Sequence, residues 1–312
     1  VPRGAKGAGM KRILIYLVTT FGLTWTFWSI GISGPVVMGM PVAELAAAGL
    51  GMFGPSAGVL AVWIVTRSEG GLDLPLHPRF QGNGRWYLTA WFAPALAVLL
   101  GGILYFGLFR SQFDPSMGYM RAFSGAAAQA YSNGQIRGMA ALQIVVAVFM
   151  GPFLNVAAGA GEELGWRGLL YPALRRRLTP VPACLLGGVI WGVWHAPMTV
   201  RGHNYGLGYA GFPWMGVVMM CVFCTAVGTL LHALTERCGS IWPAALAHGG
   251  LNAVISAPMM FLPSAEAGSR LLGPTVAGLV GGVPLLLAAA AWLTVKCRPS
   301  GENTGKIAGN GA

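Results

Sequence analysis

Two adjacent acidic residues, Glu162 and Glu163, lie within a largely hydrophobic stretch that runs from residue 139 to residue 170. A charged side chain in apolar surroundings is expensive, so it is retained where a partner or a reaction needs it. If the stretch is helical, Glu163 and Arg167 lie one turn apart, with the acid in the favoured N-terminal position. Glu162 then points about 100° away from its neighbour. The spacing predicts that Arg167 neutralises Glu163, whereas Glu162 faces a cavity without a charged partner.

Two later segments supply matching polar groups in apolar surroundings. His195 follows Trp191 by four residues, and His248 precedes Asn252 by four. Residues at this spacing share one face of a helix. Each histidine alone could equally be a hydrogen-bonded packing residue. Taken jointly with Glu162, however, they provide the general base and the hydrogen-bond donors that peptide hydrolysis by an activated water requires.

The order of these motifs along the chain is distinctive. Glu-Glu-x-x-x-Arg, then aromatic-x-x-x-His, then His-x-x-x-Asn resembles the CAAX-processing type II and bacteriocin-processing (CPBP) family, also called the abortive-infection family of intramembrane glutamate proteases. The resemblance covers about residues 151–257, and the residues that carry it are Glu162, Glu163, Arg167, His195, His248 and Asn252. Trp191 departs from the family, which more often has Phe, but it preserves an aromatic wall. The resemblance implies a membrane-embedded endopeptidase.

The chemistry of these side chains suggests a role for each, and the resemblance implies the same division. We expect Glu162 and His195 to polarise the attacking water, and His248 and Asn252 to donate hydrogen bonds to the oxyanion. Glu163, Arg167 and Trp191 are expected to support them. No cofactor or metal is expected, and a zinc site on Glu162, His195 and His248 is the less favoured alternative. No His-Glu-x-x-His motif occurs, and the only aspartates, Asp73 and Asp114, fall in predicted loops.

Composition places the chain among membrane proteins. Charged residues are 9% of the chain and hydrophobic residues are 55%, whereas soluble proteins carry about 25% charged residues. We therefore predict an all-α, polytopic integral membrane protein with about eight transmembrane helices that enclose an intramembrane polar cavity. The net charge of +11 comes from scattered basic residues, so it indicates orientation in the membrane and no nucleic-acid partner. The expected partners are membrane lipids and a peptide or protein substrate with a membrane-associated segment.

Hydropathy divides the chain into one membrane-embedded domain at residues 10–297. Residues 1–9 resemble the remnant of a cleavable tag, and residues 298–312 form a polar tail. The connection at residues 110–137 could be a lid or an interfacial element. Most Lys and Arg residues fall on one side of the predicted spans, which favours cytoplasmic N- and C-termini and a site reached from that side. The expected spans are residues 13–32, 45–66, 86–109, 139 to the arginines at 175–177, 183–200, 214–234, 241–262 and 271–295.

Two other functions remain open on the sequence. Buried acids and histidines also relay protons in transporters, and an immunity or binding protein could retain such a pocket without turnover. The sequence does not name the substrate or say whether it is prenylated.

Overall fold

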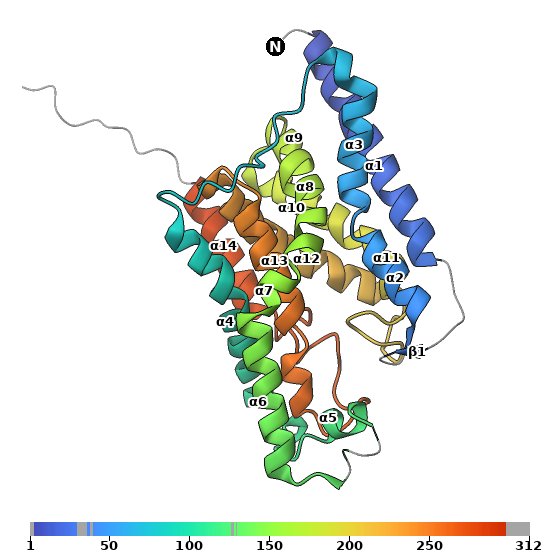
Figure 1. The fold of residues 1–312 in the computed structure, drawn as a ribbon, viewed down its shortest axis with the longest axis vertical. Helices are drawn as coiled ribbons and strands as arrows, with labels where there is room; N and C mark the ends of the chain where they lie inside the picture. Colours follow the sequence, from blue (N-terminus) through green and yellow to red (C-terminus); the bar gives the residue numbers. More distant parts are fainter. Residues whose placement is uncertain (1–2, 30–35, 38–39, 126–127, 129, 298–312) are drawn as a thin grey trace, which may run out of the picture.

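The computed structural model describes residues 3–29, 36–37, 40–125, 128 and 130–297. Within these residues the chain is helical except for loops and one pair of two-residue strands, β1 (Val36–Val37) and β2 (Met40–Pro41). The molecule is elongated: α9 (Tyr171–Arg175) lies near one end, and α5 (Gly118–Phe123) lies at the other (Figure 1). The expected polar tail lies outside the described residues, as do residues 1 and 2 of the expected tag remnant.

The helices are apolar enough for a membrane protein. Three described segments are long and hydrophobic enough to cross a bilayer, namely α4 (Gly84–Leu108), α12 (Trp214–Cys238) and residues Trp242–Phe261. A fourth results if the bent pair Leu45–Gly51 and Gly54–Glu69 counts as one span. The all-helical membrane class is therefore confirmed, whereas eight membrane-spanning helices stay a prediction.

The first part of the chain forms a helical layer along one side (Figure 1). There α1 (Arg3–Ser29) packs against α3 (Gly54–Thr66), and α2 (Val42–Gly51) meets α3 at a bend of 42°. The break coincides with Gly54-Pro55, where proline removes a backbone donor. A Cβ on Gly54 would lie 2.0 Å from Thr24 Oγ1 of α1, and one on Gly58 would lie 2.3 Å from Thr20 Oγ1. These glycines thus allow the two helices to approach closely.

Local hydrogen bonds order the described part of the connection expected at residues 110–137. Asp114 accepts hydrogen bonds from the backbone N–H groups of Ser116 and Gly118, both at 2.8 Å. Partial burial opposes ionisation, but the Ser116 hydroxyl and these amides hold the pKa of Asp114 below its usual value. The backbone of Tyr119 donates to Leu262, so the connection packs against residues that follow α13. The next helix, α6 (Asn133–Phe149), begins at a capping box between Ser132 and Gln135.

The expected fourth span is not one continuous helix. After α6 the chain forms α7 (Gly151–Leu154), α8 (Val156–Gly165), a π-helical turn η4 (Trp166–Leu170) and α9. The first break precedes Pro152, which lacks the N–H that a continuing helix needs. These segments nevertheless follow one another along the long axis (Figure 1). The two acids of the Glu-Glu motif on α8 are buried.

The last helices differ from the expected spans mainly at their ends. The expected helix at 183–200 stops at Trp194, and the one at 271–295 begins only at Val283. Residues 271–282 instead form turns, held by hydrogen bonds such as Leu279 N–H to Leu271 O at 2.8 Å. Gly273-Pro274 lies within these turns, and the residue before a proline avoids the helical conformation. The helices are α10 (Pro180–Trp194), α11 (Ala196–Thr199), α12, α13 (Trp242–Val254), the 3₁₀ turn η5 (Ala257–Phe261) and α14 (Val283–Cys297).

Glycines bring α10 unusually close to α12. A Cβ on Gly188 would lie 2.3 Å from Thr225 Cα, and one on Gly192 would lie 2.4 Å from Cys221 Cα. Gly161 faces Phe53, just before α3, and Gly165 faces Pro55 of α3 and Tyr16 of α1. Gly278 and Gly282, which have the same spacing, lie in the turns at residues 271–282. The close α10–α12 pair and α13, which packs on α8, surround the motif residues.

Candidate functional site

Glu162 is buried on α8, with 2% of its surface exposed. Two indole groups hold one of its oxygens: Trp191 Nε1 donates to Oε2 at 2.9 Å, and Trp166 Nε1 donates to the same atom at 3.2 Å. Its other oxygen, Oε1, lies 3.9 Å from Nε2 of His248. The carboxylate is therefore fixed on one side by neutral donors and turned toward an imidazole on the other.

Glu163 is fully buried one residue further along α8. Its Oε1 accepts a hydrogen bond from Arg167 Nη1 at 2.9 Å and lies 2.8 Å from Nδ1 of His248. The arginine is also fully buried, and its guanidinium lies 4.4 Å from the centroid of the Trp191 ring. The structure thus has the ion pair that the spacing predicts, and it adds a contact with His248 that the spacing does not reveal.

This contact constrains the chemistry of His248. When Nδ1–H donates to Glu163, the neutral ring presents a bare Nε2 toward Glu162, and that atom can only accept a proton. A His248 that carries a proton on both nitrogens can donate to both carboxylates or to a developing oxyanion. The histidine is 5% exposed on α13 and packs edge-on against Trp191 at 5.4 Å.

His195 lies one step away from the carboxylates. It follows the last residue of α10, and its Nδ1 lies 2.9 Å from the carbonyl oxygen of Trp191 and 3.8 Å from Cys224 Sγ. No hydrogen bond joins His195 to Glu162 in the described part of the chain. Trp191 connects them instead, since its indole binds Glu162 and its carbonyl binds the histidine.

Asn252 lies one turn after His248 on α13, as the spacing predicts. Its side chain is exposed, and it makes no hydrogen bond to any residue that the structure describes. The structure therefore brings Glu162, Glu163, Arg167, Trp191 and His248 into direct contact. It places His195 at the edge of this cluster, and it leaves Asn252 without a contact to it.

Comparison with known proteins agrees with the motif order. Residues 137–254 match the family model for type II CAAX prenyl endopeptidase, Rce1-like. This segment, a little over a third of the chain, is similar to the Rce1-like family. The chain is also 38% identical over 53 residues to CAAX prenyl protease 2 of Methanococcus maripaludis. That match spans 17% of this chain and about a fifth of the length of the relative. The resemblance noted from the motifs is confirmed.

The Rce1-like segment also contains contributors that the motifs did not single out. Trp166 is the second donor to Glu162, and its i,i+4 spacing from that residue repeats the spacing of Glu163 and Arg167. The same reasoning could therefore have found it. Cys224, beside His195, gives no comparable signal, because it comes from a distant helix and a lone buried cysteine is ordinary core.

The π-helical turn η4 belongs to the same Rce1-like segment. Its closing hydrogen bond runs from the Tyr171 N–H to the Trp166 carbonyl, five residues back, and all five residues of the turn are buried. Such turns are wider than an α-helical turn and are frequent at functional sites. No pattern in the sequence predicts it.

A zinc site would require a third ligand beside Glu162 and His248. Catalytic zinc is held by three protein side chains of the His, Cys, Asp or Glu type. The described residues contain no cluster of three such side chains within metal-binding reach. Since the donor set does not fit zinc, the zinc alternative gains no support, and a reaction without a cofactor stays a prediction.

Proposed function

We propose that this protein is an intramembrane endopeptidase that hydrolyses a peptide bond in a substrate with a membrane-associated segment. The observation that carries the proposal is the buried Glu162 carboxylate, held at Oε2 by two indole donors and turned through Oε1 toward His248. A buried acid with one free oxygen beside an imidazole is the arrangement expected of a general base. The similarity of residues 137–254 to type II CAAX prenyl endopeptidases supports the same reaction class.

The reaction follows from the positions of these groups. Glu162 Oε1 takes a proton from a water as the water oxygen bonds to the scissile carbonyl carbon. The oxyanion receives a hydrogen bond from Nε2 of a protonated His248, whose Nδ1–H is held by Glu163. Glu162 then gives its proton to the leaving amine as the C–N bond breaks, and it ends ionised as it began.

His195 and Asn252 keep their proposed roles as supporting groups. The Nδ1 atom of His195 is engaged by Trp191, which leaves Nε2 to help orient the water. Asn252 carries its amide one turn beyond His248, where it could donate to the oxyanion of a bound substrate. Arg167 holds Glu163 in place through their contact, and Glu163 in turn orients His248.

The membrane arrangement is part of the proposal. The site would lie in a polar cavity among about eight spans, with both termini on the cytoplasmic side. The substrate would then be a membrane-anchored peptide, and the relative named CAAX prenyl protease 2 favours a prenylated carboxyl-terminal segment as the first candidate. Neither a metal nor an organic cofactor takes part.

The test is cleavage by the purified protein of membrane-tethered peptides in lipid vesicles, read by mass spectrometry. Glu162→Gln should keep the fold and lower turnover by about 10²- to 10⁴-fold, the range for loss of a general base. Glu69→Gln is the matched control, because Glu69 forms an ion pair with Lys11 away from the motif residues. Activity should persist in excess EDTA.

Three outcomes would overturn the proposal. Near-normal cleavage by Glu162→Gln would remove this residue from the mechanism. Activity lost in chelator and restored by zinc would indicate a metalloprotease. Proton flux across the vesicle membrane without any cleavage by the wild type would indicate a transporter.

A further inference from the structure

A second feature, separate from the carboxylate cluster, lies between α4, α12 and α14. A groove of about 420 Å³ runs between these helices, and α13 contributes Ala247 and Leu251 to it. On α4 the lining residues extend from Trp86 to Leu100, which corresponds to about 21 Å of helix. Half of a bilayer's hydrocarbon core is about 15 Å thick. The groove is therefore long enough for an acyl chain from one leaflet.

Two cations lie at the end of this groove where α4 begins. The guanidinium of Arg85 lies 4.9 Å from the centroid of the Trp86 ring, and that of Arg237 lies 5.2 Å from the same centroid. Both arginines are exposed. Neither forms an ion pair with a carboxylate of the described residues, and the nearby Glu236 is engaged by Lys296 at 3.0 Å. Two like charges beside one ring repel each other, and an anion close to both would relieve that repulsion.

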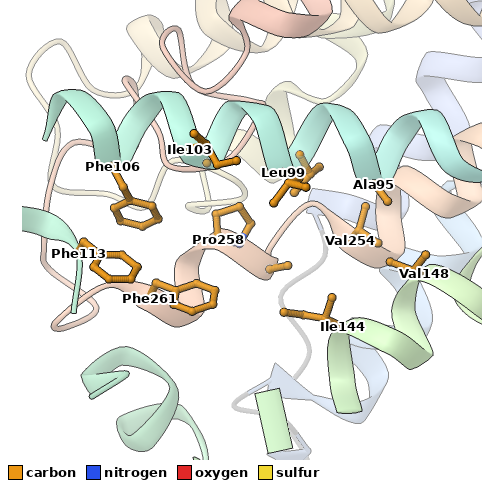
Figure 2. Close-up of a pocket in the computed structure, with 13 residues that line it drawn as sticks. Ala95, Leu99, Ile103, Phe106, Phe113, Ile144, Val148, Val254, Pro258 and Phe261 are labelled. Atoms are coloured by element: carbon orange, nitrogen blue, oxygen red, sulfur yellow. The ribbon is translucent and has the colours of Figure 1, made fainter. Parts of the chain in front are cut away.

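A second apolar pocket lacks basic residues of the kind that lie at the end of the α4–α12–α14 groove. It has a volume of about 330 Å³ and lies between α4, α6 and the residues around η5. Its lining side chains are hydrocarbon throughout, with Leu99, Phe106 and Phe261 among them (Figure 2). No cationic side chain lines it. The charge at the α4–α12–α14 groove therefore calls for its own explanation.

We propose that this groove binds an anionic phospholipid. One acyl chain lies between α4, α12 and α14, and the headgroup phosphate lies by Arg85 and Arg237, next to Trp86. Basic side chains at the end of a groove between membrane helices match the charge of such a headgroup, and tryptophan is favoured at the level of the lipid headgroups. Ala247 and Leu251 come from the helix that carries His248, so the bound chain would support one wall of the proposed site.

The test compares phosphatidylglycerol with phosphatidylcholine of identical chains, titrated onto the full chain in neutral detergent and read by native mass spectrometry. The wild type should prefer phosphatidylglycerol. The double variant Arg85→Gln/Arg237→Gln should lose about thirtyfold in affinity for it, roughly fivefold for each guanidinium, with little change for phosphatidylcholine. The matched control is Arg67→Gln/Arg110→Gln, which removes the same charge from exposed residues away from the groove and should bind as the wild type does.

A second pair of variants tests the acyl-chain contact. Ala288→Phe fills the groove without changing its charge and should weaken both lipids, whereas Ala95→Phe fills the other pocket and should leave the preference for phosphatidylglycerol intact. Glycerol 3-phosphate, which has the phosphate but no chain, should not compete. Arg85→Lys/Arg237→Lys should restore most of the binding, which separates loss of charge from loss of fold.

The proposal fails if the wild type binds both lipids equally, or if the control pair loses as much affinity as the groove pair. Competition by glycerol 3-phosphate at matched concentration would indicate a site for soluble anions instead. A neutral isoprenoid alcohol that binds as tightly as phosphatidylglycerol would indicate a site for a substrate chain. None of these measurements depends on proteolysis, so their outcome is independent of the proposed function.

Discussion

A single oxygen atom, Oε1 of Glu163, links the two halves of the site. It accepts from Arg167 one turn further along and lies in hydrogen-bond contact with His248 from α13. Because the arginine and the acid are both fully buried, their charges compensate each other in surroundings that would penalise either one alone. The pair therefore fixes the imidazole that faces Glu162. A substitution that removes either partner of the ion pair should lower the stability of the fold as well as the activity.

Arg167→Ala tests this dependence. The variant strands a buried carboxylate, so the free energy of unfolding should fall by about 3–5 kcal/mol. The measurement is thermal or denaturant unfolding in detergent, with Arg67→Ala as the control at an exposed position. If Arg167→Ala has the melting temperature of the wild type and loses only activity, the arginine belongs to the substrate site and does not stabilise the fold.

The two indole donors to Glu162 make a separate prediction. Trp191→Phe keeps the aromatic wall but removes the donor at 2.9 Å, and Trp166→Phe removes the donor at 3.2 Å. A hydrogen bond to a charged group contributes about 1.5–3 kcal/mol. Each single variant should therefore lower kcat/KM by about tenfold, because one donor remains, and the double variant should lose more than the product of the two.

The control for this experiment is Trp63→Phe, since Trp63 is half exposed on α3. Steady-state cleavage of one peptide by all four variants provides the comparison. If the loss of kcat/KM in the double variant equals the product of the losses in Trp166→Phe and Trp191→Phe, the two donors act independently on the carboxylate.

At the scale of elements, the spacing of residues in the sequence predicted side-chain contacts more accurately than hydropathy predicted where helices begin and end. The i,i+4 pair of Glu163 and Arg167 follows from helical geometry alone, and so does the contact of His195 with the Trp191 carbonyl four residues back. The contact between His248 and Glu163 joins residues 85 positions apart, so it depends on packing that no local pattern encodes. The turns at residues 271–282 were missed because hydropathy does not separate an apolar turn from an apolar helix, although Gly273-Pro274 was a visible signal.

The close contact between α10 and α12 gives a prediction about helix packing. Gly188→Ala should lower the free energy of unfolding by about 1–3 kcal/mol, because its Cβ would lie 2.3 Å from the backbone of Thr225. Gly138→Ala on α6 is the matched control: nothing lies within 4 Å of its Cβ, so the change should be neutral or slightly stabilising. A Gly188→Ala protein as stable as the control would show that α10 and α12 can move apart freely.

At the scale of the whole molecule, charged side chains mark one end. A Cβ on Gly9 of α1 would lie 2.8 Å from Arg177 Nη2, and Lys11 pairs with Glu69 after α3. These contacts group the beginning of α1, the end of α3 and the end of α9, and α5 lies at the opposite end (Figure 1). The basic residues of this group are the ones that the positive-inside rule would assign to the cytoplasm.

Cysteine labelling tests that assignment. Arg176→Cys and Ser116→Cys, each placed in a Cys297→Ser background, should react with a membrane-impermeant maleimide from opposite sides of sealed vesicles. Arg176→Cys should react from the cytoplasmic side. Cys184, Cys224 and Cys238 are buried and should contribute little background. Labelling of both new cysteines from the same side would contradict the proposed orientation.

The π-helical turn η4 has a consequence for the ancestry of the chain. A π turn holds one residue more than the α-helical turn it replaces. Insertion of a single residue into an α-helix would produce such a turn. Deletion of Gly168 would restore an ordinary helix and rotate every residue after it by about 100° relative to Glu162 and Glu163. Tyr171 and the arginines at 175–177 would then face the wrong neighbours. Relatives with this site should therefore either share the extra residue or show a compensating deletion nearby, and an alignment gap of one position at residues 166–170 would record when it arose.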